Sequence, residues 1–216
     1  MKNHDIVKLC ADSLRTFLND KHGIKLKSSH AHEIVAAFLG YKSAISLRQD
    51  MQCPITNLDQ AEYILFDTPT ALVEQRIKDL DGLPVDLPPS YILAEAIYSV
   101  LVAQEGATEK LWPSFRDLAI YLAEQLIHEK LRMLGVKPDV LPWLIDVKGG
   151  TTADGLRMSV AFDHAIEGGK RSSYAKVDVT LSRVAGHIGY GRADILPTFY
   201  SGHMRDPDFR LKLGIS

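Results

Sequence analysis

The sequence has only two cysteines among its 216 residues, Cys10 and Cys53, and this is too few for a fold held together by disulfide bonds. No apolar run approaches the roughly 20 residues that a membrane-spanning helix requires. The first residues are interrupted by charges and lack a small-residue cleavage site, so they do not resemble a secretory signal. We therefore expect a cytoplasmic protein that makes no contact with a membrane.

The chain also has little excess charge of either sign. Its 25 Lys and Arg oppose 27 Asp and Glu, for a formal net charge of -2, whereas a protein that binds nucleic acid by charge alone is strongly basic. The distribution is uneven, because residues 1–53 carry a net charge of +3, residues 54–136 of −7 and residues 137–216 of +2. Any contact with phosphate groups is therefore expected from the two ends of the chain.

Up to about residue 135, apolar residues recur every three or four positions, and this periodicity predicts helices. In residues 1–53 we expect three short helices, from about Asp5 to Asn19, from Ser28 or Ser29 to Leu39, and from a Ser43 cap to about Met51. In residues 54–136 we expect a helix start near Asn57, then helices at Ala71–Leu80, Ser90–Gln104 and Pro113–Leu134.

Beyond Pro138 apolar and polar residues alternate, which is typical of strands with one apolar face and one wet face. Three strands are expected in an antiparallel meander, at Trp143–Lys148, Leu156–Asp163 and Ala175–Ser182, and a fourth near Ile195–Tyr200 at an edge because of Pro197. The predicted fold class is α+β, with helical amino-terminal and middle regions packed on a carboxy-terminal antiparallel β-meander. The predicted regions are a small helical module at 1–53, an acidic helical region at 54–136 and a sheet region at 137–216, with 54–216 forming one folded unit.

The best-formed local pattern is a helical hairpin at residues 28–50, in which Ala36 and Gly40 have the spacing of the small residues of a helix-turn-helix. If the hairpin binds DNA, four residues face a groove and two lysines contact phosphates. These residues are Lys42, Ser43, Ser46 and Arg48 for the groove, and Lys25 and Lys27 for the phosphates. One departure is that the buried apolar position expected after the turn falls on Ser46. A hairpin that only packs within the fold explains the same pattern, and the sequence favours it.

This stretch resembles the short helical segment found in glyoxalase-related proteins and in proteins carried on bacterial plasmids and integrative elements. The resemblance covers about residues 10–50, and the residues that carry it are Ser29, Ala36, Leu39, Gly40, Tyr41 and Leu47. It implies a bacterial protein encoded on a mobile element. It implies no catalytic residue, and residues 54–216 contain no sign of the metal-binding glyoxalase fold itself.

No complete metal-binding or catalytic constellation is present, and we expect no metal and no cofactor. His30 and His32 are two residues apart on a predicted helix, so their side chains point about 200° apart around its axis. Asp146 and Lys148 share one face of a strand, as in a metal-dependent nuclease core, but that core also needs Asp139 on an adjacent strand. A strand with a wet face is the interpretation that we favour for this pair.

Other polar residues of the carboxy-terminal third form a site only if the fold brings them together; they are Asp163, His164, Asp178, His187 and His203. The function that we expect is a non-catalytic binding role with an unidentified protein partner. One alternative is a DNA-binding regulator that uses the hairpin at 28–50. The other is a metal-dependent nuclease-like enzyme that uses Asp146 and Lys148.

Overall fold

The computed structural model of the chain describes residues 5–67, 70–104, 108–133, 143–165, 172–201 and 208. The chain divides into two compact units. The first comprises Met1–Ser114 and Arg183–Gly191, and the second comprises Phe115–Ser182 and Arg192–Ser216. A short segment from late in the sequence therefore completes the first unit.

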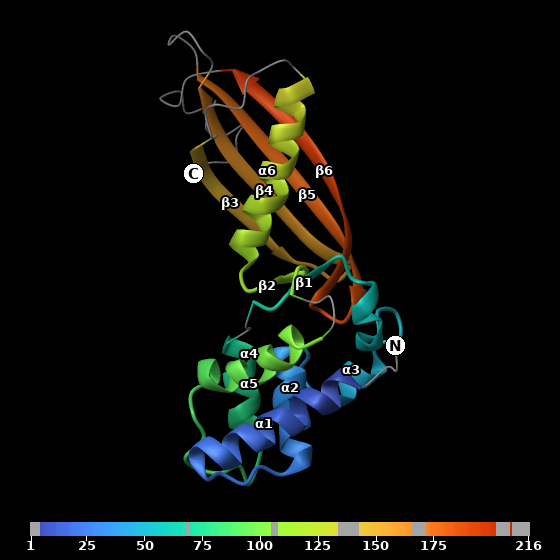
Figure 1. Ribbon diagram of the computed structural model, residues 1–216, viewed down its shortest axis with the longest axis vertical. Coiled ribbons are helices and arrows are strands. Elements are labelled where there is room, and N and C mark those ends of the chain that lie inside the picture. The colour runs from blue at the N-terminus through green and yellow to red at the C-terminus, as the bar shows by residue number, and fades with distance from the viewer. Residues whose placement is uncertain are drawn as a thin grey trace. The chain divides into compact units, whose positions relative to one another are not determined.

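The first unit is mostly helical and contains the beginning of the chain (Figure 1). Its elements are α1 (Ile6–His22), α2 (Ser28–Phe38), α3 (Ala44–Gln49), the 3-10 helix η1 (Ile55–Gln60), β1 (Tyr63–Leu65), α4 (Thr70–Asp79), α5 (Ser90–Val102) and β2 (Leu111–Trp112). The short strand β1 pairs in parallel with β2, and antiparallel with the segment from late in the sequence, where Tyr63 lies opposite Tyr190.

Helix α1 has a well-formed cap at each end. The carboxylate of Asp5 accepts hydrogen bonds from the backbone N–H groups of Val7 and Lys8, at 3.1 and 3.3 Å, which satisfies two of the donors left open in the first turn. Gly23 ends the helix in the left-handed conformation, with φ 69°. The sequence predicts the beginning of this helix, which then continues three residues beyond the predicted end near Asn19, to His22.

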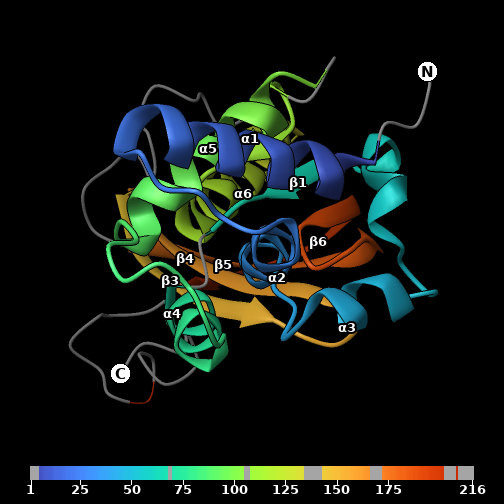
Figure 2. The ribbon, with the colours of Figure 1, turned by 90° about the horizontal axis from the view of Figure 1, so that it is seen from below.

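Helix α2 is the centre of the first unit, because α1, α3 and α4 all pack against it. Figure 2 shows α2 between α1 and α4. Six of its eleven residues are buried, among them Ile34 and Phe38, and they belong to a core that also includes Leu14 from α1 and Leu93 from α5. A helix that is apolar around most of its surface has to be covered on several sides, and the three neighbouring helices cover it.

The second unit packs one helix on an antiparallel sheet. Its elements are α6 (Phe115–Met133), β3 (Trp143–Thr151), β4 (Gly155–Ala165) and the larger parts of β5 (Ser172–Ala185) and β6 (Gly189–Ser201). β4 pairs antiparallel with β3 on one side and with β5 on the other. Helix α6 packs against β3 and β4 and buries a row of side chains that includes Leu118 and Leu122.

The predicted alternation is confirmed along β4, along β5 and on β3 from Asp146 onward, whereas the β3–β4 register shifts between Leu144 and Asp146 and places Trp143 opposite Asp163. Val160 lies opposite Val147 on β3 and Val177 on β5, while Ser159 lies opposite Lys148 and Asp178. Because residues directly opposite each other in an antiparallel pair project from the same face, these rows separate an apolar face from a polar face. The α+β fold class and the meander order β3–β4–β5–β6 are therefore as predicted.

The strand predicted near Ile195–Tyr200 is also present, as part of β6. In the strand order β6 lies between β5 and β1, but β1 has only three residues and pairs with β6 at Gly189 and Tyr190. Pro197 lies beyond that register, where a missing backbone donor is tolerated. Among the described residues, the structure contains no helix with the length and apolar composition needed to span a bilayer.

Candidate functional site

The turn between α2 and α3 is built around a glycine that no other residue can replace without strain. Gly40 has φ 85°, in the left-handed region. A Cβ at this position would lie 2.9 Å from the Cβ of His187, closer than side chains normally approach. The residue after it is held as well, because the Tyr41 backbone N–H donates to the Ala36 carbonyl at 2.9 Å. The turn geometry is therefore fixed by both backbone conformation and packing.

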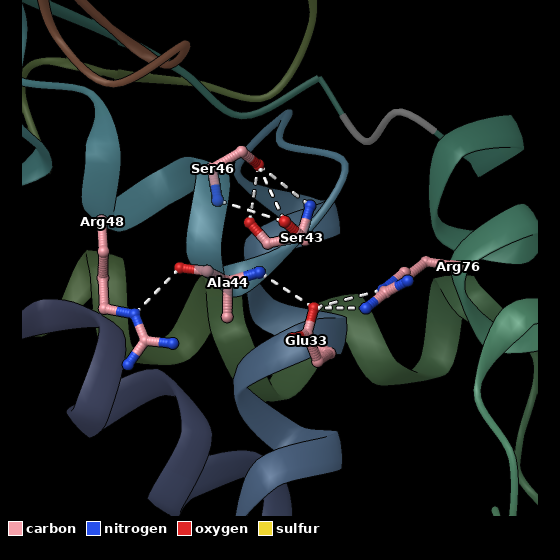
Figure 3. Close-up of polar contacts among 6 residues, drawn as sticks. All are labelled: Glu33, Ser43, Ala44, Ser46, Arg48 and Arg76. Carbon is pink, nitrogen blue, oxygen red and sulfur yellow. Dashed lines mark hydrogen bonds and ion pairs between the residues drawn. The ribbon is translucent and has the colours of Figure 1, made fainter.

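A capping box begins α3. The Ser43 hydroxyl accepts a hydrogen bond from the Ser46 backbone N–H at 3.1 Å, and the Ser46 hydroxyl accepts one from the Ser43 backbone N–H at 3.1 Å (Figure 3). The Ser46 hydroxyl also donates to the Ser43 carbonyl at 2.8 Å. Both serines were predicted to contact DNA, and here both hydroxyls satisfy the backbone of their own helix.

The beginning of α3 is also bound to α2 and α4 by one carboxylate. In Figure 3, Oε2 of Glu33 accepts the Ala44 backbone N–H at 2.9 Å and the Arg76 guanidinium at 2.7 Å from Nη2. The side chains of Glu33 and Arg76 are only 18% and 22% exposed. A carboxylate at a helix N-terminus is favourable because the open N–H groups carry partial positive charge. The first turn of α3 is therefore held by its own capping box and by Glu33, which Arg76 in turn contacts.

The Ser43 and Ser46 hydroxyls and the Glu33 carboxylate form hydrogen bonds within the fold. The exposed residues of α3 and of its two flanks are basic, polar and apolar. We define the α3 outer face as Lys42, Ile45, Arg48, Gln49 and Met51, all of which are exposed. Ile45 is 56% exposed and Met51 is 82% exposed. The guanidinium of Arg48 donates from Nε to the Ala44 carbonyl at 3.2 Å, which leaves its two terminal nitrogens on the surface.

The structure places the predicted phosphate contacts at the other end of α2. Lys25 and Lys27 are exposed and precede α2, whereas Lys42 follows it. The eleven residues of α2 span about 16 Å at 1.5 Å per residue. Lys25 lines a shallow depression along α1 that also contains Asp12 and Asp20. Leu47 fills the buried position that the helix-turn-helix pattern assigned to Ser46.

A buried polar network lies on the other side of the hairpin and is the feature that sequence reasoning missed. Tyr41 donates its phenol proton to Oδ2 of Asp50 at 2.6 Å, and the Arg183 guanidinium reaches the same oxygen at 3.3 Å. The second oxygen of Asp50 accepts the Cys53 backbone N–H at 3.2 Å. The side chains of Asp50 and Arg183 are 10% and 11% exposed. The ion pair is therefore almost fully desolvated.

His187 closes the network. Its ring stands edge-on to the Tyr41 ring with centroids 4.5 Å apart, and its Nε2 lies 3.3 Å from Nη1 of Arg183. Because a guanidinium can only donate, this contact is a hydrogen bond only when Nε2 carries no proton. Cys53 makes two further hydrogen bonds to the segment 183–191. Its thiol donates to the Arg183 carbonyl at 3.2 Å, and its carbonyl accepts the Gly186 N–H at 2.7 Å.

The pKa values of the network follow from its burial and charges. Burial tends to raise the pKa of Asp50, but the hydrogen bonds from Tyr41 and Cys53 and the charge of Arg183 outweigh it, and the pKa lies below its ordinary value. Burial and then the hydrogen bond to Asp50 raise the pKa of Tyr41. Burial and then the charge of Arg183 lower the pKa of His187, against the opposing charge of Asp50. The network is thus arranged for an ionised Asp50 and a neutral His187.

This network has the properties of a structural clamp. It connects the end of the hairpin to the segment 183–191 with two charged side chains, and the ion pair joins residues 133 positions apart in the sequence. No local pattern reveals such a pair. The only signal near it is the glycine-rich stretch from Gly186 to Gly191, in which the Tyr190 hydroxyl donates to the His187 carbonyl at 2.7 Å.

Of the other polar residues of the carboxy-terminal third, Asp178 pairs with Lys176 along β5 at 3.4 Å. Asp163 and His164 lie on β4, and their side chains are outside the described part of the structure, as is the whole of His203. His187 also has defined polar contacts, and they belong to the clamp.

The predicted nuclease-like pair lies on one face of β3, as the alternation indicates. Lys148 and Asp146 form an ion pair with each other at 3.3 Å. Asp139, the third residue of that hypothesis, lies outside the described residues. Within the described ranges, no group of three or more His, Cys, Asp or Glu side chains is arranged to hold a metal ion.

The histidines of α2 are separated as expected. His32 bonds through Nδ1 to the Ser28 carbonyl at 2.8 Å, one turn earlier on its own helix. His30 is half-buried, and its Nδ1 has no hydrogen-bond partner. The two rings therefore occupy different environments.

Comparison of the chain with protein-family models, with curated proteins and with solved structures found no match.

Proposed function

We propose that the protein has a non-catalytic binding role and that the α3 outer face contacts a protein partner. The observation that carries the proposal is the exposure of Ile45 and Arg48 on α3, of Lys42 before it and of Met51 after it. The backbone N–H groups of Ala44 and Ser46 in the first turn of α3 are bonded within the fold. Met and Arg are enriched in protein interfaces. The hairpin is held rigid by the capping box and by Glu33, so a partner meets a preformed surface.

The partner that fits this face has an apolar patch bordered by carboxylates. Burial of Ile45 or Met51 against such a patch is worth about 1.5–3 kcal/mol for each side chain. Lys42 and Arg48 would lie over the acidic border, where they contribute more to orientation and association rate than to affinity.

Site-specific photocrosslinking in cells of the native host tests the proposal. A photoreactive amino acid replaces Ile45 in one variant and Val85 in a matched control, since Val85 is a 98% exposed apolar residue outside the α3 outer face. We expect a discrete protein adduct from position 45 and none from position 85. The same adducts from both positions, or none from either, would contradict the proposal, and an adduct with nucleic acid would favour the alternative below.

A second candidate is DNA binding by the same hairpin, and one observation favours it. Two of the five acidic residues of residues 1–53, Glu33 and Asp50, are paired with Arg76 and Arg183, which come from outside that segment. The module therefore presents a more positive surface than its sequence charge of +3 indicates. If this candidate is correct, Lys42→Ala and Arg48→Ala weaken DNA binding, and affinity falls steeply with salt. No mobility shift with host or plasmid DNA at low salt would exclude it.

We further infer a bacterial origin on a mobile element and action in the cytoplasm. The support is the resemblance of about residues 10–50 to the helical segment of proteins carried on plasmids and integrative elements. Neighbouring genes for plasmid maintenance or transfer would agree with this origin, and a conserved chromosomal neighbourhood of housekeeping genes would contradict it.

A further inference from the structure

The edge strand β3 of the second unit carries charged residues in an order that is complementary to a second, antiparallel copy of the same strand. β3 is the last strand in the order β2-β1-β6-β5-β4-β3, and among the described residues no strand pairs with its outer side. It has nine residues and contains no proline. A long edge strand presents a row of open N–H and C=O groups, which can pair with a strand of another chain.

The charges on β3 are arranged symmetrically about one residue. Asp146 and Lys148 flank Val147, and the two charged side chains are 34% and 49% exposed. They lie on the polar face, because Lys148 is opposite Ser159, whereas Val147 is opposite Val160 on the apolar face that α6 covers. Gly149 and Gly150 follow, so small residues continue the strand toward Thr151.

An antiparallel alignment of two β3 strands about a two-fold axis at Val147 places Asp146 of each copy opposite Lys148 of the other. Cross-strand pairs of opposite charge stabilise a sheet. Alignments centred on Asp146 or on Lys148 place like charges opposite each other. A shift by one residue places a charged residue opposite Val147, which exchanges the two faces of the partner strand. The register centred on Val147 is therefore the one that satisfies both charge and face.

From this self-complementarity we propose that β3 pairs with β3 of a second copy of the chain, forming a two-fold symmetric dimer through the sheet edge. A two-fold contact of this kind uses the same surface on both copies. The irregularity of the β3–β4 register between Leu144 and Asp146 lies at one end of the paired segment. It limits how far the edge extends, because a bulge bends the strand away from a flat ladder. The dimer is thus centred on Asp146–Lys148.

Sedimentation of the full-length protein over a range of concentrations tests the dimer. We expect a concentration-dependent change from the 24.0 kDa monomer to a species of twice that mass. The substitution Asp146→Lys makes both facing positions positive in each half of the dimer, and it should raise the dissociation constant by about tenfold or more. The double exchange Asp146→Lys with Lys148→Asp restores opposite charges across the axis, and dimerisation should recover.

The matched control is Lys176→Asp, which reverses one member of an equivalent ion pair on the interior strand β5. It should leave the dissociation constant unchanged, and circular dichroism of every variant checks that the fold is retained. A protein that stays monomeric at all concentrations would overturn the proposal. So would a dimer that Asp146→Lys leaves intact or that the double exchange fails to restore. If β3 amides gain protection from hydrogen exchange only when another protein is added, that protein occupies the edge and the proposal of a second copy is wrong.

Discussion

The phenol of Tyr41 donates a 2.6 Å hydrogen bond to the carboxylate of Asp50, which is itself paired with Arg183. This short contact connects the turn after α2 to the residue that follows α3, and through Arg183 it reaches the segment 183–191. The turn of the hairpin and its carboxy-terminal end are thus joined at the Asp50 carboxylate. The stability of the first unit should therefore depend strongly on these few side chains.

Removal of the Asp50 charge should be far more costly than removal of the Tyr41 hydroxyl. Asp50→Asn leaves the Arg183 guanidinium buried without its counter-charge, which should lower the free energy of unfolding by about 3–5 kcal/mol. Tyr41→Phe removes one hydrogen bond to a charged acceptor and should cost about 1.5–3 kcal/mol. Urea unfolding measures both. Adding Arg183→Met to Asp50→Asn should recover part of the loss, and equal effects of the two single variants would contradict this account.

The stability of the protein should fall in mild acid because of His187. Its pKa in the fold is below the ordinary value of 6.5, so the unfolded chain binds a proton that the folded chain does not. The free energy of unfolding therefore decreases as the pH falls below about 6.5. Asp50, with a pKa below its ordinary 3.8, contributes a separate loss only when the pH falls below that value.

Urea unfolding of the wild type and of His187→Gln between pH 7.5 and pH 5 isolates this effect. Gln keeps a polar side chain at the site but cannot titrate, so its stability should change less with pH than that of the wild type. Parallel pH dependences for the two proteins would show that His187 does not contribute.

Two glycines allow a comparison of conformational strain with steric contact. Gly23 and Gly40 both have positive φ, but a Cβ at Gly23 meets no atom within 4 Å, whereas one at Gly40 lies 2.9 Å from His187 Cβ. Gly23→Ala should therefore cost about 1–2 kcal/mol from the left-handed backbone alone. Gly40→Ala should cost clearly more, as measured by thermal unfolding. If the two costs are equal, the contact with His187 is easily relieved.

Glu33 should stabilise α3 by two separable contacts. Glu33→Ala removes the acceptor for the Ala44 N–H and the partner of Arg76, and it should cost about 2 kcal/mol. Arg76→Gln removes only the ion pair and should cost less. Hydrogen exchange at the Ala44 amide distinguishes them, because it should accelerate in Glu33→Ala and change little in Arg76→Gln. Similar exchange rates in both variants would mean that Glu33 does not cap the helix.

Sequence reasoning located most helices and strands because their signals are local. The Ser43 cap and the turn at Gly40 each depend on residues within a few positions. The alternation of residues 156–163 likewise predicts β4 from its own side chains. The polar face that carries Asp146 and Lys148 follows from the same alternation.

Elements that depend on distant partners escaped prediction. β1 and β2 contain three and two residues, which are too few for a periodic signal. They pair with each other, and β1 also pairs with Gly189 and Tyr190. A helix expected to start near Asn57 is instead a 3-10 helix that ends at Gln60. The Asp50–Arg183 pair could not be anticipated at all, since nothing near either residue indicates the other.

In the DNA-binding alternative, Ser43 and Ser46 contact a DNA groove, whereas in the structure their hydroxyls form the capping box of α3. Polar residues at the start of a helix are typical both of groove contacts in DNA and of capping. The hydroxyl contacts within α3 show the capping role. The sequence does not predict a surface role for Ile45 and Met51, because large apolar residues are usually buried. Their exposure in the structure is the observation that defines the α3 outer face.

The segment 183–191 also determines when the first unit finishes folding during protein synthesis. Ribosomes translate roughly 5–20 residues per second, and Arg183 is made several seconds after Ser114, the last residue of the long part of this unit. During that interval the nascent hairpin carries Asp50 without Arg183 to pair with it. A chain that stops before residue 183 would keep Asp50 without this partner permanently.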